Sequence, residues 1–129
     1  MARSGCTVDG MTQNFDVVVV GGGAAGLSAA LMLGRSRRSV LVLDAGEPRN
    51  APAAGVHGLL GHEGTPPGEL LRKGRAEVEQ YGAVVRPARA RAAVRDDAGF
   101  ALTLDDATTV HARRIVLATG VVDQLPAVD

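Results

Sequence analysis

Apolar residues along the chain form strand-like runs that alternate with stretches of helical periodicity. Nearly continuous runs of aliphatic residues are typical of parallel strands that are buried on both faces. Such runs predict strands over residues 15–20, 39–44, 83–86 and 114–118. Helical spacing of apolar residues predicts a first helix over residues 24–35. A second helix is predicted to begin at Thr65-Pro66, an N-cap followed by a proline at the first helical position, and to end at Gly82.

Residues 88–112 show shorter apolar stretches that are separated by turn signals such as Asp96-Asp97 and Asp105-Asp106. This pattern predicts a three-stranded antiparallel meander over residues 88–94, 100–104 and 108–112. We therefore expect an α/β fold, a Rossmann-like parallel sheet with this meander inserted before its last strand. The rules for strand connections predict that the parallel strands lie in the order 83–86, 39–44, 15–20 and 114–118 across the sheet.

The segments outside these elements set the expected domain boundaries. Residues 1–14 are predicted to be a disordered tail, so that the folded domain spans residues 15–129. Residues 45–64 lack a clear period and contain several glycines and prolines, which predicts a long loop. Loops of this length inside compact domains are usually functional or disordered.

Composition and charge exclude several classes of protein. A length of 129 residues with 46% hydrophobic and 22% charged residues is typical of one packed domain. Basic and acidic residues balance at 14 each, so there is no bulk charge to hold nucleic acid or an anionic membrane. Since no apolar run near the N-terminus approaches the roughly 20 residues of a membrane span, and residues 1–14 lack a secretory signal, we expect a cytoplasmic protein. The single cysteine, Cys6, excludes an internal disulfide, and three scattered histidines do not suggest a metal site.

The strongest chemical signal is Gly21-x-Gly23-x-x-Gly26, placed where the first predicted strand turns into the first predicted helix. In a dinucleotide-binding turn, the first glycine permits the tight turn and the second lets the backbone approach a pyrophosphate. The third lets the helix pack against the strand. Free N–H groups at the helix start then face the phosphates.

A carboxylate is predicted to lie beside this glycine turn, where a ligand crevice is expected outside the carboxyl ends of the first two strands. Asp44 ends the second predicted strand, 18 residues after Gly26, and could accept hydrogen bonds from an adenosine ribose. An acidic residue at this place also disfavours a 2′-phosphate, so NADP is a poor fit. The alternative is a glycine turn with an ordinary exposed Asp, which we consider less consistent with the two features together.

The run DVVVVGGGAAGLSAALMLGRSRRSVLVLDAG, residues 16–46, resembles the N-terminal FAD-binding segment of flavoprotein disulfide reductases. The segment Ala118-Thr119-Gly120 resembles the second FAD motif of that family, and the predicted meander matches its inserted three-stranded sheet. The loop and helix start over residues 48–71 resemble the thioredoxin-reductase-like branch, especially bacterial relatives of fungal small-molecule dithiol oxidases. The resemblance covers about residues 15–128 and implies an FAD/NAD(P)-binding fold.

The resemblance and the motifs together imply an FAD site and no catalytic residue or metal ligand. The predicted cofactor-binding residues are Gly21, Gly23, Ala24, Ala25, Gly26, Asp44, Ala45, Arg49, Asn50, His57, Ala118, Thr119 and Gly120. Two interpretations stay open for the loop residues among them. Arg49 could reach the pyrophosphate and Asn50 the flavin or the adenosine, or both could simply form a turn. His57 could relay protons beside the flavin, or it could be a loop histidine bonded to local backbone, which is the more common case. His62 and His111 are expected at the surface.

The sequence also departs from the family pattern. It contains no Cys-x-x-Cys pair and no second Gly-x-Gly-x-x-Gly, it lacks the last strand and helix of the FAD domain, and it has Asp44 where Glu is common. These departures suggest the first part of a longer enzyme, with this chain inactive by itself. A further expectation is a homo-oligomer, because the missing strand would leave one sheet edge uncovered.

The resemblance implies a parent enzyme that moves electrons between NAD(P)H, FAD and a dithiol/disulfide pair. NAD(P)H would serve only that full-length parent, and thioredoxin or a small dithiol would be its substrate. This chain would supply the site for the adenosine and pyrophosphate of FAD. The alternatives are a flavin-dependent dithiol oxidase that passes electrons to oxygen, and a non-catalytic nucleotide-binding remnant.

Overall fold

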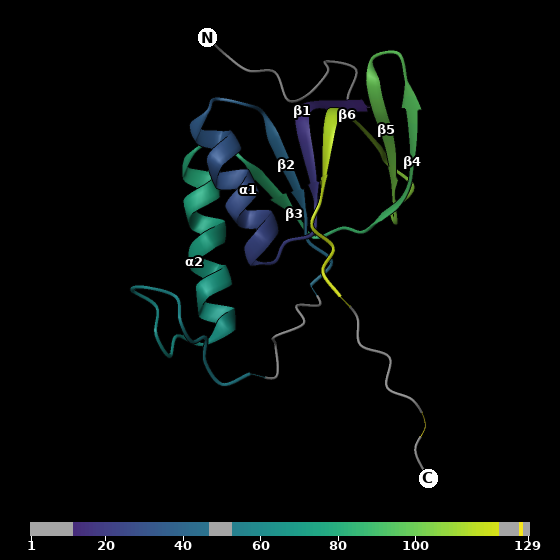
Figure 1. Cartoon of the computed structure of the whole chain (residues 1–129). Coiled ribbons are helices and arrows are strands. Elements are labelled where there is room, and N and C mark those ends of the chain that lie inside the picture. The colour runs from purple at the N-terminus through teal and green to yellow at the C-terminus, as the bar shows by residue number, and fades with distance from the viewer. Residues whose placement is uncertain (1–11, 47–52, 122–126, 128–129) are drawn as a thin grey trace.

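The computed structural model describes residues 12–46, 53–121 and 127. Along these residues two strand–helix pairs are followed by four consecutive strands (Figure 1). The elements are β1 (Thr12–Val20), α1 (Ala24–Arg35), β2 (Val40–Leu43), α2 (Pro67–Gln80), β3 (Val84–Arg86), β4 (Ala90–Asp96), β5 (Gly99–Leu104) and β6 (Thr109–Leu117).

All six strands belong to one sheet, in the order β3-β2-β1-β6-β5-β4. β3, β2, β1 and β6 run parallel to one another, whereas β5 pairs antiparallel with β6 and with β4. The predicted order of the four parallel strands is therefore confirmed, and so is the Rossmann-like α/β class with an antiparallel part.

The last two predicted strands are a single strand. Residues 108–112 were predicted as the last strand of the meander and residues 114–118 as a separate parallel strand, but β6 runs without a break from Thr109 to Leu117. Its first half pairs with β5 on one side, as far as Ala112, and its whole length pairs with β1 on the other side. Arg113 and Arg114 are both exposed, because β5 has already ended its pairing where they occur. The meander is thus continuous with the parallel sheet.

The first strand begins earlier than its apolar run predicts. β1 starts at Thr12, so residues 12–14 belong to a strand and not to the predicted tail. These polar residues pair with Thr109, Val110 and His111 of β6, and the Oε1 of Gln13 accepts a hydrogen bond from Arg86. These residues form a strand because their backbones pair with β6. A pattern of hydrophobic residues cannot predict such pairing.

Alternate residues of the parallel strands face two different layers. One buried cluster joins the sheet to the helices and contains Val17, Val19, Leu27, Ala30, Val40, Val42, Leu71, Val78 and Ala83. The other joins the opposite face to the meander and contains Phe15, Val18, Leu41, Leu43, Ala88, Leu102, Leu104, Val110 and Ala112. Figure 1 shows both helices on one side of the parallel strands and the β4–β5 hairpin on the other. This burial on both faces explains the continuous apolar runs.

The helices end much as predicted, with one difference at the start of α2. α1 spans the predicted residues. The helix α2 begins at Pro67, with Pro66 in the N-cap position and no side-chain cap, so the predicted start is one residue early. Gly82 follows the helix with a φ of 88°, the left-handed conformation that commonly ends helices. In the part of the chain that the structure describes, neither helix is long and apolar enough to cross a membrane.

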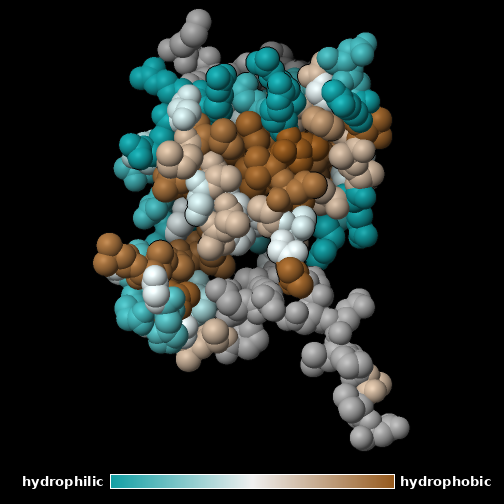
Figure 2. Space-filling view, viewed as in Figure 1, coloured by the Kyte–Doolittle hydropathy of each residue, from teal (hydrophilic) through white to brown (hydrophobic). Residues whose placement is uncertain are grey.

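Among the residues that the structure describes, one side of β6 has no strand paired with it beyond Ala112. Beyond Ala112, β6 pairs with β1 alone, because the pairing with β5 has ended. Leu117 at its end is 77% exposed. Figure 2, which has the same view as Figure 1, shows an apolar surface between the helices and the meander.

Candidate functional site

The carboxyl ends of three parallel strands meet at one edge of the sheet (Figure 1). There the N–H of Gly21 donates to Leu43 O at 2.9 Å, and the N–H of Ala118 donates to Val20 O at 2.8 Å. These bonds join the ends of β1, β2 and β6. The glycine turn, Asp44 and the segment 118–120, which lie far apart in sequence, are thereby brought together at the carboxyl ends of the strands, where the ligand crevice is predicted. Crevices of this kind are where open α/β sheets bind ligands.

At two glycines of the motif, other protein atoms occupy the space that a side chain would need. Gly21 has a φ of 120°, and a Cβ atom on it would overlap the carbonyl oxygen of Ala118. A Cβ atom on Gly26 would overlap the carbonyl oxygen of Gly21. The first glycine therefore allows the turn to pack against the strand-end segment of β6, and the third allows α1 to pack against the turn.

Gly23 differs from its neighbours because it borders open space. A Cβ atom on it would meet nothing within 4 Å. It is the N-cap of α1, and its carbonyl accepts the N–H of Leu27 at 2.9 Å. Ala24 and Ala25, which follow, are exposed, and the first turn of the helix carries no acidic residue. The positive end of the helix thus faces a space beside a residue without a side chain, which fits a phosphate-bearing group.

Asp44 is held from three directions. A Cβ atom on Gly22 would lie within 3 Å of Asp44 Oδ1 and closer still to its Cγ, so the carboxylate packs directly on that glycine. The N–H of Gly46 donates to Asp44 Oδ1 at 2.9 Å, and Nη1 of Arg75 lies 3.8 Å from Oδ2. The Asp44 side chain remains 22% exposed. Its orientation is therefore fixed while part of the carboxylate still faces solvent.

Sequence reasoning missed two residues of this arrangement. Gly22 was treated as a spacer within the glycine motif, although the run of three glycines could have suggested a further close approach. Arg75 gave no signal, because its place beside Asp44 depends on how α2 packs in three dimensions.

Of the other predicted site residues, some lie near the ends of β2 and β6 and some lie outside the described residues. Ala45, Thr119 and Gly120 are exposed beside the crevice, and Gly120 has a φ of 70°, so the chain turns directly after β6. Arg49 and Asn50 lie outside the described residues.

His57 has a partner within its own loop. Its Nδ1 lies 2.8 Å from Glu63 Oε2, and Glu63 Oε1 accepts the N–H of Gly58 at 2.8 Å. The hydrogen bond with His57 and that N–H lower the pKa of the Glu63 carboxyl below its ordinary value. The His57 side chain is 77% exposed. The loop closes on itself through hydrogen bonds of Val56 with Gly64 and Thr65. His57 is thus bonded within its loop, but its recorded partner is the side chain of Glu63 and not the backbone that the second interpretation named.

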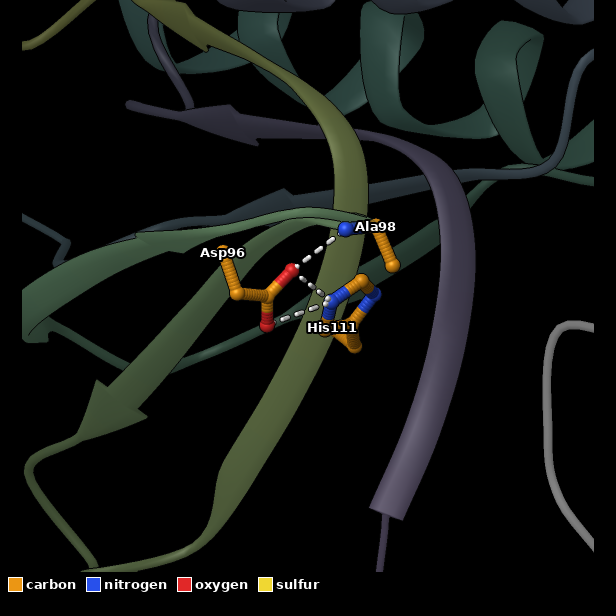
Figure 3. A network of polar contacts seen from close by, with 3 residues as sticks. All are labelled: Asp96, Ala98 and His111. Atoms are coloured by element: carbon orange, nitrogen blue, oxygen red, sulfur yellow. Dashed lines mark hydrogen bonds and ion pairs between the residues drawn. The ribbon is translucent and has the colours of Figure 1, made fainter.

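A second polar cluster lies at the opposite end of β6. Figure 3 shows the carboxylate of Asp96 pointing toward both the ring of His111 and the backbone nitrogen of Ala98. Nε2 of His111 is 3.4 Å from Asp96 Oδ2, and Asp96 Oδ1 accepts the N–H of Ala98 at 2.8 Å. His111 is 20% exposed, so it is more buried than a surface histidine. The cluster links the β4–β5 turn to β6 and lies away from the crevice. No group of three or more potential metal ligands occurs among residues 12–46, 53–121 and 127.

Comparison with known proteins gives consistent matches over nearly all of the chain. The family model described as pyridine nucleotide-disulphide oxidoreductase matches residues 15–129. A thioredoxin reductase of Leptosphaeria maculans is 36% identical over 118 residues, which are 88% of this chain and 36% of that protein. The chain spans about a third of the length of the curated relatives it matches.

Solved structures agree with the sequence comparison. The crystal structure of HlmI superimposes with a TM-score of 0.83 at 44% identity, over 88% of this chain and 37% of that one. An oxidoreductase from Agrobacterium tumefaciens superimposes with a TM-score of 0.82 at 42% identity, over 88% of this chain and 39% of that one.

Proposed function

Because the chain belongs to the pyridine nucleotide-disulphide oxidoreductase family, we propose that it binds the adenosine and pyrophosphate half of FAD in the crevice at the ends of β1, β2 and β6. The observation that carries this proposal is the contrast between Gly23 and its neighbours. At Gly21, Gly22 and Gly26, protein atoms occupy the space that a Cβ atom would need. Gly23 instead borders open space at the start of α1. A bare backbone at the N-terminus of a helix that follows a strand is what close approach of a pyrophosphate requires.

Each part of the site has a proposed role. The N–H groups at the start of α1 and the bare backbone of Gly23 would hold the pyrophosphate. Asp44 would accept hydrogen bonds from the two ribose hydroxyls, since a carboxylate has about four acceptor positions and Gly46 occupies one. The exposed segment Thr119-Gly120 would close the crevice from the side of β6.

The activity proposed for the whole protein is electron transfer between NAD(P)H, FAD and a dithiol/disulfide pair. Its support is that the relatives are oxidoreductases, several of them named as thioredoxin reductases. Flavin supplies the electron-transfer chemistry when bound, whereas the protein binds and orients it. These 129 residues contain one cysteine and so hold no pair for disulfide exchange. We therefore propose that this chain binds the cofactor and does not by itself reduce disulfides.

Calorimetric titration of the purified chain tests the binding proposal. We expect FAD to bind more tightly than NAD or NADP, and the variant Gly23→Val to lose FAD binding while it keeps its circular dichroism spectrum. Gly68→Val is the matched control, because Gly68 lies in the first turn of α2 and also borders open space. Tighter binding of NAD than of FAD, or unchanged affinity in Gly23→Val, would contradict the proposal.

A further inference from the structure

A cation from α2 lies beside the predicted ribose position. Nη1 of Arg75 is 3.8 Å from Oδ2 of Asp44, and the two side chains are 36% and 22% exposed. The two residues are 31 positions apart in sequence and belong to different layers of the fold. Their approach is therefore a result of tertiary packing.

The position of Arg75 is set by the packing of α2 on α1. Gly74 directly precedes it, and a Cβ atom on Gly74 would lie 3.1 Å from Cδ1 of Leu27. Leu71 and Val78 on the same helix are buried in the cluster that joins the helices to the sheet. These apolar contacts position the backbone of α2. The ion pair of Arg75 with Asp44 is therefore not needed to hold the helix against the sheet.

Among the described residues, Arg75 is the partner recorded for Asp44 Oδ2, whereas Oδ1 has a backbone donor. Gly46 donates its N–H to Oδ1, and Gly22 packs beneath the carboxylate, whereas Oδ2 faces Arg75. An ionised carboxylate has two oxygens with about four acceptor positions, so it can accept one hydrogen bond from each hydroxyl of a vicinal diol when it is turned toward that diol. An attractive cation at Oδ2 restricts rotation of the carboxylate and leaves further acceptor positions open.

We propose that Arg75 is a positioning residue for ribose recognition: it holds the Asp44 carboxylate in the orientation that meets the 2′- and 3′-hydroxyls of an adenosine ribose. This inference rests on the proposed nucleotide site. It adds a specific claim: Arg75 affects the affinity for the ribose hydroxyls, and it affects neither the binding of the phosphates nor the stability of the fold.

The test compares two probes that differ by one hydroxyl group. ADP and 2′-deoxy-ADP are titrated into the whole chain by calorimetry, and the ratio of their affinities measures recognition of the diol. We expect wild type to prefer ADP and Arg75→Ala to lower that ratio by roughly fivefold, the upper end for a partly exposed ion pair. Arg75→Lys should recover part of the ratio. Arg72→Ala, an exposed arginine on the same helix, is the control for charge and should leave the ratio unchanged.

The outcomes separate this inference from the proposal on which it rests. If Arg75→Ala weakens both probes equally, its role is structural and the inference is wrong. If wild type binds both probes with equal affinity, nucleotide binding stands but diol recognition by Asp44 and Arg75 does not. If wild type binds neither probe, the proposed function fails, and this inference with it.

Discussion

Gly21 packs so closely against the carbonyl oxygen of Ala118 that no side chain fits between them. Gly21 begins the turn after β1, and Ala118 follows the end of β6, 97 residues later in the chain. The two sequence motifs that suggested a nucleotide site are therefore parts of one packed corner. The N–H of Ala118 also donates to Val20 O, which joins the same two segments by their backbones.

The first prediction concerns this corner. Gly21→Ala should lower the free energy of unfolding by more than about 1 kcal/mol, because alanine disfavours a φ of 120° and its Cβ would overlap Ala118 O. Gly23→Ala should change stability far less, since its Cβ would meet nothing within 4 Å. Urea denaturation measures both. Equal stability of the two variants would contradict the structure of the corner.

The crevice could be predicted from the sequence because its chemistry is local. The glycine spacing requires only a strand that turns into a helix, and Asp44 requires only the end of the next parallel strand. The contacts of Asp44 with Gly22 and Arg75 could not be predicted in this way, since they depend on the exact approach of layers. The bond between His57 and Glu63 likewise depends on how the loop closes.

The fold showed the same division between local pattern and tertiary context. The strand order followed from connection rules, because parallel neighbours with right-handed crossovers allow few arrangements. The continuity of β6 did not follow, because its first half has the pattern of a short meander strand and its second half that of a buried parallel strand. The exposure of Arg113 and Arg114 comes from the partial pairing of β6 with β5, which the pattern along one segment does not encode.

The second prediction concerns the carboxylate of the site. Asp44→Ala should weaken FAD binding by about 1–3 kcal/mol, the range for hydrogen bonds to a charged group that are lost. Calorimetry of the variant and wild type measures the difference. Asp97→Ala is the control, because Asp97 is exposed in the β4–β5 turn, away from the crevice. Wild-type affinity in Asp44→Ala would remove Asp44 from the site.

The third prediction is a pH dependence of stability that arises at Asp16. Its Oδ2 accepts the N–H of Ser39 at 2.8 Å, and its own N–H donates to Ser39 Oγ at 2.8 Å. The bond from Ser39, with smaller contributions from Arg38 and Arg113, lowers the pKa of Asp16 below its ordinary value of 3.8. A folded-state pKa below the unfolded one stabilises the fold above pH 3.8, and this contribution is lost as the pH falls through the lower folded value.

Replacement of Asp16 should therefore act mainly at neutral pH. Asp16→Asn should be less stable than wild type at pH 7, and the difference should shrink as the pH falls below 3.8. Thermal unfolding followed across this range measures the difference, with the exposed Asp105→Asn as a control for net charge. A difference that stays constant with pH would show that Asp16 does not titrate with folding.

The fourth prediction concerns catalysis by this chain. Because its one cysteine, Cys6, leaves no dithiol pair, we expect no NADPH-dependent reduction of the disulfide reagent DTNB, with or without added FAD. Absorbance of the released thiol measures the rate, and an intact thioredoxin reductase is the positive control. Robust reduction by the Cys6→Ser variant would show that electrons reach the disulfide by a route that needs no thiol of this chain.

The last prediction follows from the unpaired part of β6. Within the described part of the chain, β6 pairs with β1 alone beyond Ala112, and Leu117 at its end is 77% exposed. An open strand edge with apolar side chains favours pairing with another chain. We therefore expect the purified chain to self-associate, and Leu117→Lys to reduce that association, because an edge lysine opposes strand pairing.

Sedimentation velocity at several protein concentrations measures this effect. Met32→Lys is the matched control, because it also replaces an exposed apolar residue with lysine but lies on α1. FAD should raise the thermal midpoint of wild type and of both variants, since a ligand that binds only the folded state adds about 2.7 kcal/mol at 100 times its dissociation constant. If Met32→Lys reduces association as much as Leu117→Lys does, the contact between copies lies on the helices and not at the edge of β6.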